Sequence, residues 1–406
     1  MKKIPPRRSA AVLLLVFMLT FAQVEKVEAQ SAFSSAQSPN TSAATVGAAS
    51  NSSMPPPIAA YGSENIDRQI AATFAPVFYQ GLGSNPRYDY ITNFDFDNDW
   101  RGDNNWKNAG DFAIPLRSYV YYSVAETPTH YFVIYAVFHP CDYKGGMMRG
   151  RILSRLIGMG VGALGRIAPT GRVSEATLAH ENDLEGALVV AEKRGANLWD
   201  ARVRFVETLA HDRFLKYLPR IETAADTGRI GLDGQRTELY VEPRGHGIRT
   251  RLTGKVNRKA KDELVYKYTG EAEEVTNLSG RIIGYALVPL NTTLWASALA
   301  GENQTYAEAR DYRKLLAAVT AKAAGRGQAD EGEVFSLGIG SAFRGKIGGT
   351  NMARPPWGWF DTTERKRPLG EWFFDPAGTV KRHFNLDESF STTYIHAPAA
   401  GITRPL

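Results

Sequence analysis

Hydrophobic residues along the chain gather in short runs of strand length. These runs are rich in β-branched and aromatic residues and are bounded by Pro, Gly or Asn, a pattern typical of β-strands. Residues 131–138 are apolar at both parities, which predicts a strand covered on both faces. The expected strands are 74–80, 118–126, 129–140, 184–193, 237–243, 280–290 and 333–340.

The connections between these runs indicate the fold class. Residues 126–130 (ETPTH) form a tight connection, which predicts an antiparallel strand pair. One helix is expected at about 305–325, where a helical pattern ends on Gly325. Strands do not alternate regularly with helices. The pattern therefore predicts a mainly β protein, a β-sandwich with appended helices and a C-terminal extension, over a βαβ layout.

The amino terminus has a different character. A basic start precedes an apolar run at 10–22, and small residues around Ala29 suit cleavage, so residues 1–29 are expected to be a signal peptide. The protein is accordingly expected to be secreted, into the periplasm if its source is bacterial. Residues 30–57 are rich in Ser, Ala, Asn and Pro and are expected to be a disordered linker.

Two domains are expected beyond the linker. Residues 58–300 are assigned to the β-sandwich, with an insertion at 145–177, and residues 301–406 to a C-terminal helix and an aromatic-rich extension. Without residues 1–29, 43 basic residues face 40 acidic ones, a net charge of +3 that does not favour a nucleic-acid partner. Cys141 is the only cysteine, which excludes an internal disulfide and favours a buried small side chain over a nucleophile.

A group of metal-ligand residue types stands next to the two central strands. If a strand begins at 184, Asp183 and Glu185 share one of its faces, and His180 lies on the preceding loop. Asp142 follows Pro140, which is expected to end its strand. If the strands are neighbours, three carboxylates gather with one imidazole, and such carboxylates repel one another unless a cation holds them. The alternative is a solvated charged loop entering a strand.

Two stretches resemble the necrosis- and ethylene-inducing-like proteins (NLPs), a family of secreted cytolysins. Residues 133–142 (VIYAVFHPCD) are similar to the family's MYSWYFPKD stretch, and residues 179–185 (AHENDLE) to its heptapeptide GHRHDWE. The resemblance covers about 70–250 and implies a β-sandwich with a metal at one edge. The chain lacks the family's cysteine pair and carries the 145–177 insertion. The metal ligands implied by the resemblance are Asp142, His180, Asp183 and Glu185.

Other residues near these motifs are candidates for ligand binding. Glu181 and Asn182 replace the arginine and the second histidine of the heptapeptide. His246 stands between two glycines in a turn, where it borders the site or, alternatively, hydrogen-bonds the backbone. His211 faces the same pocket or, as we favour, lies in a surface turn. The oxygen-rich donor set with one imidazole favours Mg²⁺, Ca²⁺ or Mn²⁺ over zinc.

Each of three further segments allows two interpretations of its structure or function. The acidic stretch 94–105 is expected to be an Asp-rich turn in preference to a calcium loop. Residues 150–168 carry arginines on one helical face, which suits peripheral contact with a membrane; the alternative is a mobile loop over the core. The aromatic residues of 355–361 and 371–378 are expected to form a core in preference to a sugar-stacking cleft.

The function expected from these features is divalent-metal binding by a secreted NLP-like protein that recognises glycolipid or glycan headgroups on membranes and is cytolytic. The alternative is a metal-dependent secreted hydrolase of glycosides or phosphoesters, with His246 or Asp142 as the base. No nucleophile elbow, HExxH motif or phosphate loop is present in the sequence, so binding is favoured over catalysis.

Overall fold

A hairpin of two long strands, β3 (His130–Asp142) and β4 (His180–Glu192), forms the centre of the protein. Both strands are apolar at consecutive positions, and residues 132–143 are all buried. A strand buried on both faces needs cover on each side, and other segments of the chain supply it. In the computed structural model, the described residues are 62–143, 179–219, 227–251, 262–276, 282–323, 338–347 and 353–404.

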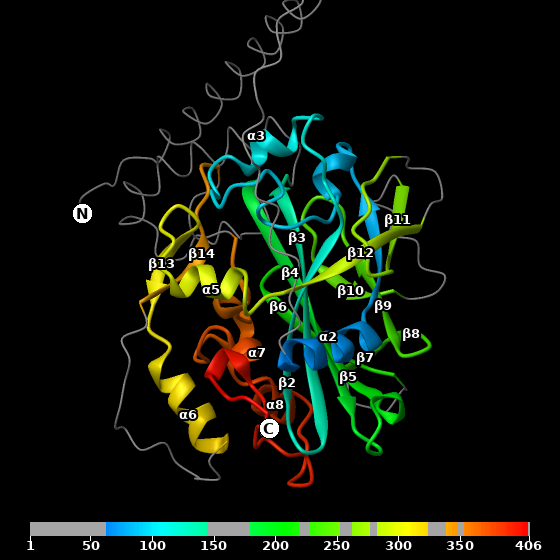
Figure 1. The fold of residues 1–406 in the computed structure, drawn as a ribbon, viewed down its shortest axis with the longest axis vertical. Coiled ribbons are helices and arrows are strands. Elements are labelled where there is room, and N and C mark those ends of the chain that lie inside the picture. The colour runs from blue at the N-terminus through cyan, green and yellow to red at the C-terminus, as the bar shows by residue number, and fades with distance from the viewer. Residues whose placement is uncertain are drawn as a thin grey trace, which may run out of the picture. The chain divides into compact units, whose positions relative to one another are not determined.

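The central hairpin belongs to one continuous mixed sheet. Within the described residues, this sheet has 12 strands in the order β10-β9-β1-β11-β12-β2-β3-β4-β5-β6-β7, with β8 paired to β9 (Figure 1). Its other strands are β1 (Val77–Leu82), β2 (Tyr119–Glu126), β5 (Arg202–Ala210), β6 (Arg213–Leu218), β7 (Thr227–Arg229), β8 (Gly231–Asp233), β9 (Arg236–Val241), β10 (Ile248–Thr250), β11 (Asp262–Tyr268) and β12 (Ile282–Pro289).

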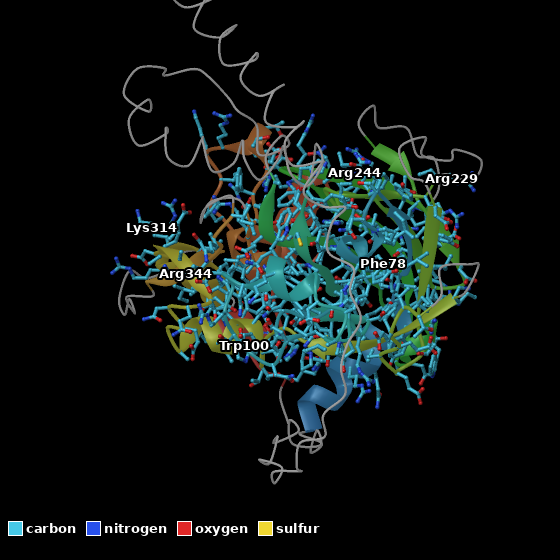
Figure 2. All side chains as sticks on the ribbon, turned by 90° about the horizontal axis from the view of Figure 1, so that it is seen from above. Phe78, Trp100, Arg229, Arg244, Lys314 and Arg344 are labelled. Carbon is cyan, nitrogen blue, oxygen red and sulfur yellow. The ribbon has the colours of Figure 1, made fainter. Side chains whose placement is uncertain are left out.

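The sheet curls until it is nearly closed. β10, at one end of the strand order, returns to β5, and the Thr208 hydroxyl donates to the carbonyl of Ile248 at 2.7 Å. The protein is therefore mainly β, as predicted. The expected β-sandwich is not confirmed, because the strands form one curled sheet whose interior is filled by large side chains such as Phe78 (Figure 2).

The helices and a small second sheet flank this curled sheet. The second sheet pairs β13 with β14, and it lies with α5 to α8 on one side of the central hairpin (Figure 1). These elements are α2 (Gly62–Phe74), α3 (Asn105–Ala109), α5 (Leu294–Leu299), β13 (Tyr306–Arg310), α6 (Arg313–Ala323), β14 (Ile339–Phe343), α7 (Glu371–Phe374) and α8 (Pro376–His383). None of the helices in the described part of the chain has the length and apolarity needed to cross a bilayer.

The strand predictions are largely confirmed, and the antiparallel pairing of β2 with β3 across the tight connection is as expected. The prediction at 74–80 is wrong in its first half, because α2 ends at Phe74 and β1 begins at Val77. The helix expected at 305–325 is also wrong in its first half. There, Tyr306 is buried against Phe343 in the β13–β14 pair, and this tertiary pairing overrides helix propensity.

Several predictions concern segments outside the described residues. These are the signal peptide (1–29), the linker (30–57), the insertion (145–177) with its amphipathic segment (150–168), Gly325 at the end of the expected helix, and residues 333–337 of the strand expected at 333–340.

The aromatic residues of the C-terminal extension form a core, as predicted. Trp357 and Trp372 are fully buried, and Trp372 stacks on Phe214 of β6 with ring centroids 4.1 Å apart. The Trp359 indole N–H lies 3.0 Å from the carbonyl of Leu184 and 2.9 Å from that of Arg354, which places its ring against Gly186 of β4. The extension is thus fixed to the central hairpin.

Gly186 is the position where this contact is tightest. A Cβ atom there would lie 2.3 Å from the Trp359 ring and 3.0 Å from the carbonyl oxygen of Tyr135. Because the Trp359 ring is held by its hydrogen bonds, we expect Gly186→Ala to lower the free energy of unfolding by about 1 to 3 kcal/mol through overpacking. Chemical denaturation measures this change.

Gly338 provides the matched control. A Cβ atom there meets only the side chain of Ala309, at 4.0 Å, so Gly338→Ala is expected to change stability by less than about 1 kcal/mol. Equal effects of the two substitutions would show that Trp359 does not pack against Gly186 as described.

Candidate functional site

The register of the β3–β4 pair brings the candidate residues together. His139 is paired with Asp183, and Asp142 is paired with His180. Two predictions about this region are wrong: Pro140 does not end its strand, and His180 lies in β4 instead of a preceding loop. Proline removes one N–H from the ladder, and the facing strand has a left-handed φ of 59° at Asn182, while the register continues unbroken to Asp142 and His180.

His180 and Asp142 form a close pair at the end of the ladder. His180 Nδ1 lies 2.8 Å from the carbonyl oxygen of Asn182 and 3.2 Å from that of Glu181. Carbonyl oxygens only accept hydrogen bonds, so Nδ1 carries the proton and, in the neutral ring, Nε2 carries the lone pair. His180 Nε2 lies 3.6 Å from Asp142 Oδ2, and both side chains are buried.

His246 bridges two buried carboxylates. Its Nδ1 lies 2.9 Å from Asp183 Oδ2, and its Nε2 lies 3.3 Å from Asp89 Oδ1. Burial alone would lower the pKa of His246, but the hydrogen bonds and charges of Asp183 and Asp89 raise it to about 9. The ring is therefore a buried imidazolium at neutral pH. His246 lies beside a predicted metal ligand, and both its ring nitrogens are engaged by side chains.

Asp89 accepts hydrogen bonds through both of its carboxylate oxygens. Its Oδ2 accepts from the backbone N–H of Gly83 at 2.7 Å and from the Tyr143 hydroxyl at 2.6 Å. Its Oδ1 accepts from the backbone N–H of Arg244 at 2.7 Å, in addition to His246. Asp89 is fully buried, so this one side chain joins the end of β3 to the loop after β1 and to the turn that carries His246.

A second histidine lies flat against His246. The His139 and His246 rings are 3.7 Å apart and 4° from parallel. Burial, and then the charge of His246, lower the pKa of His139 well below its usual range, so this ring is neutral. His139 Nε2 faces Gln80 Oε1 at 2.9 Å, and Gln80 uses its amide nitrogen for the carbonyl of Gly81. His139 therefore donates through Nε2.

Glu185 connects the cluster to the turn between β5 and β6. The backbone N–H of His211 donates to Glu185 Oε1 at 3.1 Å, and His211 Nε2 lies 3.3 Å from Glu242 Oε2. Burial would raise the pKa of Glu242, but hydrogen bonds from His211 and Arg249 lower it to about 2. His211 occupies a turn, as predicted, but its side chain is largely buried and reaches the site.

Glu181 and Asn182 hold loops in place. The Glu181 carboxylate accepts from the backbone N–H groups of Trp106, Lys346 and Ile347. The Asn182 amide accepts from Asn105 and donates to the carbonyls of Gly102 and Arg344. Both side chains are buried, and these contacts direct them to the neighbouring loops. A direct role in ligand binding remains a prediction.

Backbone strain is concentrated around the cluster. Four of the non-glycine residues with positive φ are Asn182 (59°), His211 (65°), Arg244 (72°) and His246 (51°). This conformation is uncommon for residues other than glycine and persists where the surrounding contacts enforce it, often at functional sites. The acidic stretch 94–105, by contrast, is a turn in which Asn108 donates to Asp97 and Asn104 donates to Asp99.

Asp89, His139 and Gln80 were not recognised from the sequence. His139 carries a signal, since it is a polar residue inside an otherwise apolar strand, and a buried polar group is informative. Asp89 lies in a short 3₁₀ helix (Pro86–Asp89) without any motif around it, so only the fold reveals its role.

Comparisons with known proteins find a distant likeness to NLP structures. A toxin-fold structure of microbial attack and plant defence is 15% identical, with a TM-score of 0.25, over 54% of this chain and 72% of its own. NLPPya in complex with mannosamine is 14% identical, with a TM-score of 0.25, over 47% and 70%. Necrosis and ethylene inducing protein 2 from the agent of cocoa's witches' broom disease is 16% identical, with a TM-score of 0.24, over 45% and 67%.

The likeness to these proteins is a distant structural one. No protein-family model matches the chain, and no curated protein matches it by sequence. The chain resembles NLPs in the two motifs and, distantly, in structure. The chemistry of its site therefore has to be argued from its own residues.

The contacts of Asp89 generate a testable expectation. Asp89→Asn removes the charge that faces buried His246. It also replaces one accepting oxygen by an NH₂ group, which would face hydrogen-bond donors and leave them without an acceptor. We expect it to lower the free energy of unfolding by about 3 to 5 kcal/mol, the usual effect of breaking a buried ion pair. Urea denaturation near neutral pH measures the effect.

Asp233→Asn is the control. Asp233 also pairs with a cation, Lys267, at 3.2 Å, but its side chain is 58% exposed, so a loss below about 1 kcal/mol is expected. A loss of the same size at both positions would contradict the central role given to Asp89.

Proposed function

We propose that this protein is a secreted, divalent-metal-binding protein that uses the end of the β3–β4 hairpin to recognise glycan or glycolipid headgroups. The ligands of this proposal are Asp142, His180, Asp183 and Glu185, and the cation is Mg²⁺, Ca²⁺ or Mn²⁺. The observation that carries it is the His180–Asp142 pair, which is followed along β4 by two further buried carboxylates.

The geometry of the His180–Asp142 pair suits two ligands of one cation. Its 3.6 Å separation is outside hydrogen-bonding distance. Two ligand atoms that are each about 2.1 to 2.4 Å from one ion lie about 3 to 4 Å apart. In addition, histidine ligands of metals commonly donate their other ring N–H to a backbone carbonyl, and His180 Nδ1 does so.

Asp183 and Glu185 fit in chemistry but are engaged elsewhere in this structure. Asp183 contacts His246, and Glu185 contacts His211. In the part of the chain that the structure describes, no group of three or more His, Cys, Asp or Glu side chains is arranged to hold a metal ion. The proposal therefore requires Asp183 and Glu185 to turn toward the His180–Asp142 pair, while one oxygen of each can keep its histidine partner, as metal-bound carboxylates often do.

Recognition is favoured over hydrolysis by the state of His246. A general base must be unprotonated and must face a water molecule. His246 has a pKa raised to about 9 and holds a carboxylate on each ring nitrogen. It therefore serves as a fixed positive charge, and the hydrolase alternative loses one of its two candidate bases.

The proposal also includes export from the cell, a membrane target and cytolysis. Export rests on the basic and apolar pattern of residues 1–29, and a membrane glycolipid is a target that an exported protein can reach. Sugar hydroxyls are suitable oxygen ligands for the open positions of a hard cation. Cytolysis would then follow from attachment to a target membrane.

Metal binding is tested by calorimetric titration of the EDTA-stripped protein with Mg²⁺, Ca²⁺ and Mn²⁺. We expect about one site, and we expect Asp142→Asn to weaken the affinity at least about tenfold, because it removes a ligand charge. Asp97→Asn changes a half-buried aspartate outside the cluster and should alter the affinity less than about twofold. Absence of binding at millimolar metal, or equal losses in both variants, would refute the metal site.

The role of the cation is tested by sedimentation with glycolipid-containing vesicles. If the cation serves recognition, EDTA should abolish binding, and adding back the metal should restore it. A structural metal predicts a lower melting temperature in EDTA with vesicle binding unchanged. Vesicle binding that persists unchanged in EDTA would overturn the recognition role.

A further inference from the structure

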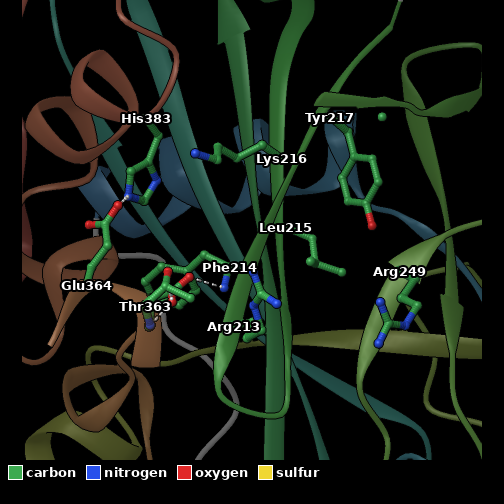
Figure 3. Close-up of a pocket in the computed structure, with 11 residues that line it drawn as sticks. Arg213, Phe214, Leu215, Lys216, Tyr217, Arg249, Thr363, Glu364 and His383 are labelled. Atoms are coloured by element: carbon green, nitrogen blue, oxygen red, sulfur yellow. Dashed lines mark hydrogen bonds and ion pairs between the residues drawn. The ribbon is translucent and has the colours of Figure 1, made fainter. Parts of the chain in front are cut away.

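The C-terminal extension meets the sheet at a buried histidine that the proposed function does not use. This residue, His383, is the last residue of α8. Together with Glu364, which ends a short 3₁₀ helix (Thr362–Glu364), and with consecutive residues of β6, it lines a pocket of about 480 Å³ between the extension and the sheet (Figure 3). The contacts of His383 therefore bear directly on how the extension is attached.

His383 is enclosed by two carboxylates. Its Nδ1 lies 2.9 Å from each carboxylate oxygen of Glu207 on β5, and its Nε2 lies 3.5 Å from Glu364 Oε1. The His383 side chain is only 2% exposed, and that of Glu207 is fully buried. An ionised carboxylate only accepts hydrogen bonds, so Nδ1 carries a proton. When Nε2 is protonated as well, the positive ring faces an anion on each side.

The charge of Glu207 is balanced by this imidazole. The other hydrogen bond to its carboxylate comes from the neutral indole N–H of Trp372, at 2.7 Å. Lys216 is paired in register with Glu207 on β6, but among the described residues only His383 forms an ion pair with it. A buried carboxylate is costly when its cation is removed. The proton on His383 therefore stabilises the contact between α8 and β5.

The remaining charged groups around His383 come from several elements. On α8 itself, Arg382 pairs with Glu364 and with Glu371 of α7. The pocket beside the ring is also lined by charged residues of β6, of β10 and of the segment before the 3₁₀ helix, namely Arg213, Lys216, Arg249 and Asp361. Burial lowers the pKa of His383 and Arg382 lowers it further, but Glu207 and then Glu364 raise it, and the net result is a raised pKa.

We propose that the Glu207–His383–Glu364 group is a pH switch in the attachment of the C-terminal extension. With its ring protonated, His383 holds α8 and the Trp372 ring against β5 and β6, where Trp372 stacks on Phe214. Loss of one ring proton leaves Glu207 without its cation and directs the lone pair of Nε2 at Glu364, so the contact weakens. This switch does not depend on the proposed metal site.

The direction of the pH effect follows from the sign of the shift. A histidine in the unfolded chain titrates at about pH 6.5. Because the pKa of His383 is raised in the folded protein, its contribution to stability is fully present below about pH 6.5 and is lost as the pH rises through the folded pKa. Alkaline conditions are therefore expected to weaken the attachment.

The first test compares the wild type with His383→Gln by urea denaturation at about pH 6 and about pH 9. The variant lacks the cation and should unfold more readily than the wild type at the lower pH. At the higher pH the wild type has lost the same cation, so the ratio of variant to wild-type unfolding constants should fall at least about threefold. Other titrating groups, such as His246, act equally in both proteins and cancel in this ratio.

His130→Gln is the matched control. His130 is also buried, but burial lowers its pKa to about 4, so its folded ring is neutral over the same range. Only the unfolded chain binds a proton at this histidine near pH 6. The ratio of variant to wild-type unfolding constants should therefore rise about fourfold from pH 6 to pH 9, the opposite direction. Changes of the same sign and size in both variants would contradict the proposal.

The second test observes the indole N–H signals of ¹⁵N-labelled protein by NMR. The Trp372 N–H contacts Glu207 directly, so its signal should move as His383 titrates between about pH 6 and about pH 9. The Trp357 N–H donates to the carbonyl of Gly340 at 2.7 Å, and its signal should stay in place. Trp372→Phe, which keeps an aromatic ring at this position, identifies the signal by its absence.

The NMR titration also decides the question if His383→Gln does not fold, because it is carried out on the wild type. A Trp372 signal that stays in place over this pH range would overturn the proposal. So would a Trp372 signal that still moves by the same amount in folded His383→Gln, since the titrating group would then be another one.

Discussion

The hydrogen-bonded chain Asp89–His246–Asp183 is the constraint on which the rest of the site depends. Two ionised carboxylates that are buried near each other need a compensating positive charge, and the His246 imidazolium provides it inside the protein. The chain also fixes three segments that are distant in sequence: the loop after β1, the turn after β9 and the start of β4. The strained backbone at Arg244 and His246 belongs to the turn that places the imidazole between both aspartates, and these contacts hold it.

The same chain orders the candidate metal ligands. Asp183 is paired in register with His139, whose neutral ring stacks on His246, so the position of the Asp183 side chain is fixed from two sides. Three residues before Asp183, on the other side of Asn182 with its left-handed φ, His180 faces Asp142. The ladder thus holds a carboxylate that an imidazolium satisfies near the His180–Asp142 pair, which is where the proposal puts the cation.

The sequence predicts the parts of this arrangement that depend on local patterns. Apolar runs at 118–126, 129–140 and 184–193 identify the central strands, and the order of Asp142, His180, Asp183 and Glu185 identifies the candidate ligands. Contacts between distant segments are not encoded in such patterns. Asp89 has no motif, and its partners come from three separate places in the chain: the loop after β1, the end of β3 and the turn after β9. The curled single sheet is likewise set by pairings such as β1 with β9 and β11, which alternation along one strand cannot reveal.

The C-terminal extension is part of the support of the site. Trp359 packs on Gly186, one residue beyond Glu185, and hydrogen-bonds the carbonyl of Leu184. The loop at 344–347 holds Glu181 and Asn182 through backbone groups. The residues on both sides of Asp183 are therefore held by two segments that come after the curled sheet in the sequence, the loop at 344–347 and the extension that carries Trp359. The residues of a site are held in place by the segments that pack against them. The extension therefore helps to position the β4 cluster, although it supplies none of the proposed ligands.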